Sequence, residues 1–278
     1  MNVRTMSREE LDTAVRWADD EGWNPGLFDG DAFYATDPQG FLVGLIDDKP
    51  VACISAVSYA GTFGFIGFYI VRPEFRGQGL GLQIWNSGMR HLDGHLIGLD
   101  GVVDQQTNYM RSGFQLAHRS IRFVAQANPP ESAAIRCRRI THNDLPALCD
   151  YDLLGFPVIR GRFLEAWIAM PDTKTVVFEE NRVLRGYGTV RPCRSGFKIG
   201  PLFADSFQVA SEIYGELCRE LKPGSEVFLD VPEPNLAAQN LIKLFNMQPR
   251  FEVARMYTGS APNLDLGRVF GNTTFELG

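Results

Sequence analysis

The six residues from Arg76 to Gly81, RGQGLG in one-letter code, have the composition and spacing of a turn that binds phosphate groups. They follow an apolar run rich in aromatic and β-branched side chains, which predicts a buried strand over Phe63–Val71, and they precede an apolar, helix-compatible segment. Glycines between a strand and a helix let a ligand reach the backbone, where the first N–H groups of the helix lack intrahelical partners. These N–H groups lie at the positive end of the helix dipole and bind anions. Arg76 would add a charge-assisted hydrogen bond to a diphosphate.

Glycine spacing separates this turn from two common phosphate-binding loops. The dinucleotide fingerprint requires G-x-G-x-x-G, whereas Gly77, Gly79 and Gly81 are spaced G-x-G-x-G. The ATP-binding P-loop requires Lys-Ser or Lys-Thr after its last glycine, and this chain has Leu-Gln there. A nucleotide-binding oxidoreductase or kinase is therefore excluded. Two interpretations remain, a tight strand-to-helix connection without a ligand and a diphosphate site with the pattern Arg-x-x-Gly-x-Gly.

The Arg-x-x-Gly-x-Gly pattern directly after an apolar strand resembles the pyrophosphate loop of the GCN5-related N-acetyltransferases (GNATs). A second motif supports the resemblance, because residues 108–114, NYMRSGF, are similar to the L-Y-x-K-x-G-F sequence that often ends a helix in this family. Here Asn replaces Leu and Arg replaces Lys, while Tyr109, Gly113 and Phe114 match. One position departs from the family pattern, since the asparagine often found seven residues before the tyrosine is Val102.

The resemblance implies that the chain is an acyl-CoA-dependent N-acyltransferase that moves an acetyl group from acetyl-CoA to a primary amine. The acceptor would be a small molecule, an amino acid or a lysine side chain. The glycine loop would hold the coenzyme diphosphate, the preceding strand would pair with the pantetheine arm and polarise the thioester through a backbone N–H, and Tyr109 would protonate the leaving sulfur. The implied coenzyme-binding residues are Phe68, Tyr69, Ile70, Val71, Arg76, Gly77, Gln78, Gly79, Leu80, Gly81 and Tyr109. In an alternative interpretation, Tyr109 only packs an aromatic ring on the sheet.

The general base that removes the amine proton is not identified by the resemblance. Many relatives carry a glutamate on the strand before the loop, whereas residues 63–71 contain no carboxylate. The candidates are Glu21, Glu74, Asp100 and Asp104. Glu21 is predicted as a catalytic and substrate-binding residue, in a loop with Trp23 and Asn24 that would shape the acceptor site; alternatively it is an exposed acid at a helix end. Asp100 is predicted to contact substrate, although the matching Asp230 in the second half favours a structural role.

The elements that position these residues follow the GNAT order in the first half. Ser7 and Glu10 have the spacing of a capping box at the start of a helix. We expect a helix to about residue 20, a loop at 21–31, and a hairpin of strands at 40–46 and 51–59. The strand at 63–71, the phosphate loop and a helix follow. A strand at 95–101, a helix at 104–111 and a strand at 121–124 complete the order. Residues 1–127 are predicted to form the coenzyme-binding and catalytic GNAT domain.

A second half repeats this order after residues 128–134, where two prolines in polar surroundings predict a linker. Residues 141–144 predict a helix cap, strands are expected at 175–179, 184–190, 197–202 and 227–231, and helices at 207–221 and 235–247. Residues 259–278 predict a linker and a terminal strand at 269–277 that packs back onto the first domain. The second half lacks Arg-x-x-Gly-x-Gly, and Ile242 stands at the tyrosine position.

We therefore expect an α/β (α+β) fold with two tandem GNAT-like domains, each a mixed, mostly antiparallel sheet flanked by helices, as in a bacterial subgroup of the family. Residues 135–278 would form a degenerate domain that shapes the acceptor site or is structural. The acceptor would lie between the acidic N-terminal loop and this domain. A non-catalytic module that responds to coenzyme A is the alternative function.

The amino-acid composition narrows the possible partners, metals and cellular location. A net charge of −6 over 278 residues argues against nucleic acid as a partner, and residues 1–50 carry the whole acidic excess, which would favour a cationic acceptor. Five scattered cysteines without a C-x-x-C pair and four histidines without ligand spacing predict no metal. The apolar runs are too short for a membrane span, and the polar N-terminus lacks a signal-peptide core, so we expect a cytoplasmic protein. The GNAT resemblance implies acetyl-CoA as its cosubstrate, and we expect a monomer or homodimer.

Overall fold

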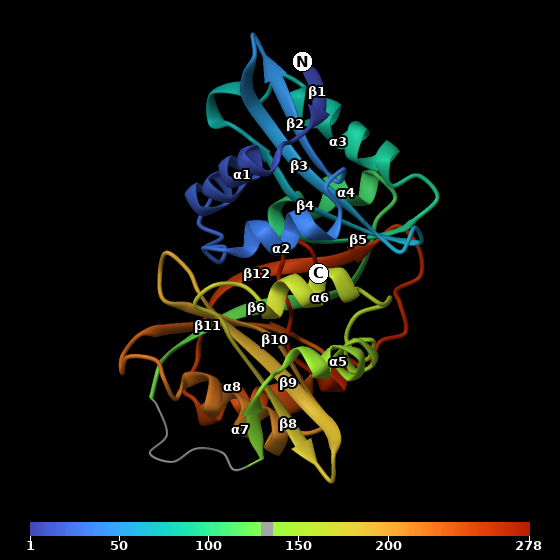
Figure 1. Cartoon of the computed structure of the whole chain (residues 1–278). Helices are drawn as coiled ribbons and strands as arrows, with labels where there is room; N and C mark the ends of the chain where they lie inside the picture. The colour runs from blue at the N-terminus through green and yellow to red at the C-terminus, as the bar shows by residue number, and fades with distance from the viewer. Residues whose placement is uncertain (129–135) are drawn as a thin grey trace.

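The computed structural model describes residues 1–128 and 136–278, and Figure 1 shows the two halves of the chain stacked one on the other. The first half contains the predicted elements in the predicted order, with β1 and α2 in addition, and the capping box of Ser7 and Glu10 opens its first helix. Its strands are β1 (Asn2–Thr5), β2 (Phe41–Ile46), β3 (Lys49–Tyr59), β4 (Phe63–Val71), β5 (Leu96–Val102) and β6 (Gln115–Gln126). Its helices are α1 (Arg8–Asp20), α2 (Asp29–Thr36), α3 (Leu80–His91) and α4 (Gln106–Arg111), with short 3-10 turns at Pro73–Phe75 and Val103–Gln105.

The second half contains the strands and helices that were predicted, with ends that shift by a few residues, and two elements that were not, α6 and β12. Its strands are β7 (Cys137–Arg139), β8 (Lys174–Glu180), β9 (Val183–Pro192), β10 (Phe197–Ala204), β11 (Glu226–Pro232), β12 (Gln248–Tyr257) and β13 (Val269–Gly271). Its helices are α5 (Leu145–Asp152), α6 (Gly161–Ile168), α7 (Phe207–Cys218) and α8 (Leu236–Leu244), with 3-10 turns at His142–Asp144 and Leu266–Arg268. The predicted cap before α5 is present, since Thr141 and Asp144 form a capping box. The predicted linker lies, apart from residue 128, outside the described residues.

Helix α2 was not predicted, because residues 21–31 were expected to form a loop. Its first residue, Asp29, is buried, accepts a hydrogen bond from Gly26 N at 2.8 Å and pairs with Arg191 Nε of β9 at 2.8 Å. Phe33 of α2 stacks on Trp167 of α6 with ring centroids 6.2 Å apart, and Figure 1 shows the two helices facing each other across the halves. Contacts with the second half therefore stabilise α2, and these are not encoded in the local pattern.

One sheet runs through both halves, and the halves exchange strands within it. The order of neighbouring strands is β1-β2-β3-β4-β5-β12-β6-β11-β10-β9-β8-β7, and β13 pairs with β10. Strand β12 of the second half thus lies between β5 and β6, and β6 of the first half lies between β12 and β11. Only β4–β5 and β10–β11 are parallel among the described strand pairs, so the predicted mixed, mostly antiparallel fold class is confirmed. The division at residues 127 and 135 stays a prediction.

The C-terminal segment returns to the first half, as expected, but the predicted strand over 269–277 is wrong beyond β13. The hydroxyl of Thr274 accepts hydrogen bonds from the backbone N–H groups of Glu276 (3.0 Å) and Leu277 (2.9 Å), which forms a local turn in place of a ladder. Tyr59 Oη of β3 donates to the carbonyl oxygen of Leu277 at 3.0 Å. A Cβ atom on Gly67 of β4 would overlap the carbonyl oxygen of Glu276, so this close approach requires glycine.

Buried apolar side chains form three clusters in the described residues. One lies under α3 and includes Trp85, one surrounds α7, and the third joins the halves through Phe68, Trp167 and Leu277. Separation of the halves would expose the third cluster to water, which is unfavourable because apolar surface is poorly solvated. No helix within residues 1–128 and 136–278 combines the length and the hydropathy that crossing a bilayer requires.

Candidate active site

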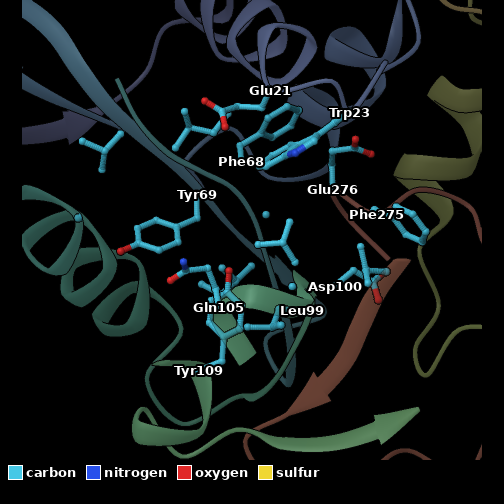
Figure 2. Close-up of a pocket in the computed structure, with 18 of the residues that line it drawn as sticks. Glu21, Trp23, Phe68, Tyr69, Leu99, Asp100, Gln105, Tyr109, Phe275 and Glu276 are labelled. Carbon is cyan, nitrogen blue, oxygen red and sulfur yellow. The ribbon is translucent and has the colours of Figure 1, made fainter. Parts of the chain in front are cut away.

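A cleft of about 510 Å³ opens where β4 and β5 separate (Figure 2). The two strands pair only from Phe63–Ile66 on β4 to Leu96–Leu99 on β5. Beyond that point β4 has a bulge against β3, and Phe68 adopts a φ of 43° in the left-handed region. The backbone groups after Ile66 therefore do not pair with β5 and line the cleft instead. The volume is typical of a small-molecule site.

The predicted phosphate loop forms the outer end of the cleft. Gly77 and Gly79 have φ values of 76° and 75°, and Gly79 precedes the first residue of α3 without any side-chain cap. A Cβ atom on either glycine would meet nothing within 4 Å, so the surface above them is open, whereas a Cβ on Gly81 would lie 2.7 Å from Tyr69 Oη. The first backbone N–H groups of α3 are thus accessible to an anion.

Most of the predicted coenzyme-binding residues line this cleft. They are Phe68, Tyr69, Ile70, Val71, Arg76, Gly77, Gly81 and Tyr109. Gln78, Gly79 and Leu80 are not among the lining residues: the first two are exposed in the loop, and Leu80, the first residue of α3, is buried in the apolar cluster that includes Trp85. On the acceptor side, Glu21, Trp23 and Asp100 line the cleft. Asn24 does not, because its amide group bonds to the backbone N and O of Ser195 in the second half at 3.2 and 2.9 Å.

Tyr109 lies on α4 with one edge of its ring close to Gly101 of β5. A Cβ atom on Gly101 of β5 would overlap the ring, so glycine at that position lets the tyrosine approach the strand. Trp85 of α3 packs against the other side with ring centroids 5.6 Å apart. Burial raises the pKa of the Tyr109 phenol above its usual value of 10, which keeps the hydroxyl protonated at neutral pH. Figure 2 shows this hydroxyl pointing into the cleft, while the hydroxyl of Tyr69 turns toward α3.

The carboxylates near the loop are paired or lie outside the cleft. Glu21 accepts a hydrogen bond from Arg76 Nη2, and Arg76 Nε donates to the carbonyl oxygen of Val71 at 2.8 Å. Glu74 pairs with Arg72 at 2.7 Å on the surface, and Asp104 is exposed. Neither Glu74 nor Asp104 lines the cleft. In the described part of the chain, no three His, Cys, Asp or Glu side chains gather as metal ligands would.

Asp100 lines the cleft, but its carboxylate is bound to an arginine from the second half. Arg255 of β12 donates from Nε and Nη2 to its two oxygens at 2.7 and 2.6 Å, and the Asp100 side chain has no exposed surface. A matching pair joins Asp230 of β11 to Arg122 of β6 at 2.6 and 2.7 Å. Burial alone would raise the pKa of Asp230, but the charge and hydrogen bonds of Arg122 outweigh it and lower that pKa.

The second half also supplies lining residues that the sequence did not identify. Phe251 and Val253 come from β12, and Phe275 and Glu276 come from the C-terminal segment. Glu276 is 2% exposed, and its Oε2 atom has no hydrogen-bond partner within the described residues. The expectation that the C-terminal segment packs onto the first half pointed toward this region. No motif singles out these side chains, because the strand exchange brings them to the cleft.

Comparison with known proteins identifies the family. The sequence model described as "Acetyltransferase (GNAT) family" matches residues 5–111, and the one described as "Acetyltransferase (GNAT) domain" matches residues 148–271. The chain therefore belongs to the GNAT family, with two GNAT domains in tandem, and it is an acyltransferase of the GNAT type. This confirms the resemblance carried by the Arg76 loop and the Tyr109 motif. GNAT proteins in general use an acyl-CoA and an amine acceptor.

Relatives and solved structures agree with this assignment. Holothin acyltransferase from Pseudoalteromonas sp. (strain SANK 73390) is 29% identical over 277 residues, which cover 99% of this chain and 94% of that protein. An acetyltransferase candidate from Pyrococcus horikoshii has a similar structure, with a TM-score of 0.83, 23% identity and coverage of 100% of this chain and 95% of that one. A tandem GNAT protein from the clavulanic acid biosynthesis pathway has a TM-score of 0.62 and 10% identity, with 94% and 99% coverage. These two structures support the fold.

Proposed function

We propose that this protein transfers an acetyl group from acetyl-CoA to the primary amine of a small molecule. One observation carries the proposal: a single cleft connects an open glycine loop at a helix N-terminus, a strand edge without a partner, and a buried protonated tyrosine. The loop fits a diphosphate because its left-handed glycines leave the backbone uncovered. The unpaired edge of β4 fits an extended amide chain, which can bind as an added strand.

Acyl-CoA supplies the acyl group as a thioester, and the chain provides the groups that assist its transfer. Backbone N–H groups of Phe68–Val71 donate to the thioester oxygen and stabilise the charge that develops when the amine nitrogen attacks the carbonyl carbon. The C–N bond forms and the C–S bond breaks. Tyr109 then gives its phenolic proton to the sulfur, and the burial that raises its pKa ensures that the proton is present before the reaction.

In this proposal, Glu21 acts through Arg76 and does not serve as the base. The Glu21 carboxylate is paired with Nη2 of the Arg76 guanidinium, and Nε of the same guanidinium donates to the carbonyl oxygen of Val71. The pair keeps Arg76 at the edge of the loop, ready to contact the diphosphate. Asp100 is likewise assigned a structural role, because both of its oxygens accept from Arg255.

Calorimetry with acetyl-CoA tests the proposal directly. Wild-type protein should bind, and Gly79→Glu should lose at least about tenfold in affinity, because it places a side chain in a left-handed position and a negative charge beside the diphosphate. Gly224→Glu is a matched control, since Gly224 also has a positive φ of 81° and open space but lies in the second half. Absence of binding by the wild type, or equal binding by Gly79→Glu, would overturn the proposal.

Release of free thiol from acetyl-CoA then measures transfer to an amine panel. Holothin, the compound named for the relative in Pseudoalteromonas, belongs in this panel beside simple primary amines. Longer acyl-CoA donors test the choice of acetyl. Thiol release that depends on an added amine supports an enzyme, whereas tight acetyl-CoA binding without any amine-dependent release would indicate the coenzyme-responsive module.

A further inference from the structure

The acceptor side of the cleft contains a carboxylate that none of the predicted roles uses. The C-terminal segment crosses β4 at the point where β4 leaves β5, since the carbonyl oxygen of Glu276 occupies the space that a Cβ atom on Gly67 would need. Tyr59 fixes the next residue of the segment through its 3.0 Å hydrogen bond to Leu277. Glu276 is thereby held beside the bulge at Phe68, where the thioester would lie in the proposed function.

Glu276 differs from the two other acids that line the cleft, because no cation pairs with its carboxylate within the described residues. Glu21 is paired with Arg76 and Asp100 with Arg255, whereas Oε2 of Glu276 is buried and has no hydrogen-bond partner in the described ranges. A buried carboxylate without a partner is unfavourable, because it loses its water and receives nothing in return. A bound ammonium group would supply the missing partner.

Nearby cations act on Glu276 but already have partners of their own. Arg122 binds both oxygens of Asp230 and the carbonyl oxygen of Trp23, and Lys198 donates to the same carbonyl at 3.4 Å. Burial lowers the pKa of Lys198, while the charge of Glu276 opposes this effect. Both cations therefore have oxygen partners elsewhere, and Oε2 of Glu276 is left without one.

Aromatic rings surround this carboxylate. Trp23, Phe68, Phe251 and Phe275 line the same part of the cleft, and Figure 2 shows Glu276 beside Trp23 and Phe68, with Phe275 on the opposite side. The rings of Phe251 and Phe275 lie 6.4 Å apart and separate Arg122 from the cleft, with the guanidinium carbon 5.0 Å from the Phe275 ring. Such walls favour a flat apolar group, and one free carboxylate matches one positive charge.

We propose that Glu276 binds the ammonium group of a small, singly charged arylalkyl amine, a flat ring that bears a primary aliphatic amine, and accepts its proton. This inference rests on the proposed acetyl transfer and names its acceptor class. The proton moves from the ammonium to the Glu276 carboxylate, which leaves a neutral amine and a carboxylic acid. The amine lone pair then forms the C–N bond, the C–S electron pair leaves with sulfur, and the proton from Tyr109 neutralises the thiolate. The extra proton on the new amide nitrogen is released to water. Glu276 then loses its proton to solvent and the Tyr109 phenolate regains one from solvent, so that both side chains return to their starting states and the net reaction releases one proton.

The test compares wild type with Glu276→Gln, using benzylamine as the acceptor. Glu276→Gln should lower kcat/KM for benzylamine about 100-fold or more and leave the acetyl-CoA Kd within twofold. Its Tm should be equal or higher, because the variant removes an unpaired buried charge; a merely structural glutamate would give a lower Tm. Glu252→Gln is the control, since Glu252 lies on the exposed face of β12 in an ion pair with Arg119.

Binding to the protein loaded with coenzyme A separates recognition from turnover. Wild type should bind benzylammonium at least about tenfold more tightly than Glu276→Gln does, while both bind benzyl alcohol, which has the ring without the charge, equally. Spermidine should be a poorer acceptor than benzylamine by at least about tenfold, because the described cleft offers one free carboxylate.

The possible failures are distinguishable. If the wild type does not bind acetyl-CoA, the proposed function fails and this inference fails with it. If acetyl-CoA binds but benzylamine is neither bound nor acetylated, the proposed acceptor class and this inference are overturned, while the proposed function stands. A preference for spermidine over benzylamine has the same consequence. If Glu276→Gln acetylates benzylamine as fast as wild type, or loses acetyl-CoA affinity as much as rate, the role of Glu276 is refuted while acetyl transfer stands.

Discussion

Asp100 and Arg255 lie 155 residues apart in the chain and face each other as direct register partners on β5 and β12, joined by hydrogen bonds of 2.7 and 2.6 Å. Asp230 and Arg122 repeat this arrangement on β11 and β6. In both pairs the aspartate comes from one half of the chain and the arginine from the other. The exchange of strands thus places an equivalent buried ion pair at each junction, and one of them forms a wall of the cleft.

Loss of Arg255 should destabilise the protein more than loss of an exposed arginine. Arg255→Met leaves the buried carboxylate of Asp100 without a partner, which costs about 3–5 kcal/mol, as for other buried ion pairs that lose one partner. Arg4→Met, which breaks the exposed pair with Glu10, should cost about 1 kcal/mol or less. Urea unfolding measures both values.

The double variant Asp100→Asn/Arg255→Met separates charge from packing. It should recover part of the lost free energy of unfolding, because no unpaired charge remains. Equal costs for Arg255→Met and Arg4→Met would contradict the importance of the buried pair.

Removal of the Tyr109 hydroxyl should slow transfer without weakening coenzyme binding. Tyr109→Phe keeps the ring that packs on Gly101 and Trp85 but removes the proton donor, so kcat should fall about 100-fold while the acetyl-CoA Kd stays constant. Because burial raises the pKa of Tyr109 above 10, the wild-type rate should show no loss from this group up to pH 10. Tyr214→Phe is the matched control, as Tyr214 is also a buried tyrosine but lies in the second half. An unchanged kcat in Tyr109→Phe would exclude the hydroxyl as the acid.

Neutralising Glu21 tests whether this residue positions Arg76 or acts as the general base. In Glu21→Gln the guanidinium loses its ion-pair partner at a partly exposed site and gains freedom to contact a diphosphate, so acetyl-CoA affinity should rise about two- to fivefold at low salt. The rate at saturating substrates should change by less than about threefold. A fall in kcat of about 100-fold would instead identify Glu21 as the base.

Local chemistry explains which parts of the molecule the sequence predicted. The glycine loop, the Tyr109 motif and the capping boxes depend on residues close together in the chain, and the structure contains all of them. The exchange of β6 and β12 depends instead on pairing across more than a hundred residues, which no local pattern specifies. Helix α2 and the position of Glu276 likewise depend on contacts between the halves, so neither was predicted. The same cause explains why Asp100 was recognised without Arg255.

Acid should lower the stability of the folded protein through His118, which lies where β6 pairs with β12. This residue lies on β6 opposite Arg255 of β12, and burial, followed by the charge of Arg255, lowers its pKa from the usual 6.5 to about 3. Between these values the unfolded chain binds a proton that the folded chain does not, so stability from this group is complete above pH 6.5 and falls as the pH drops toward 3. The slope should be about 1 kcal/mol per pH unit. Urea unfolding of wild type and His118→Gln at pH 7, 6 and 5 measures this slope, and the variant should lose less stability on acidification. In NMR spectra of the folded wild type, His118 should show no titration above pH 5. Parallel curves for the two proteins would show that β6 and β12 do not bury this imidazole in solution.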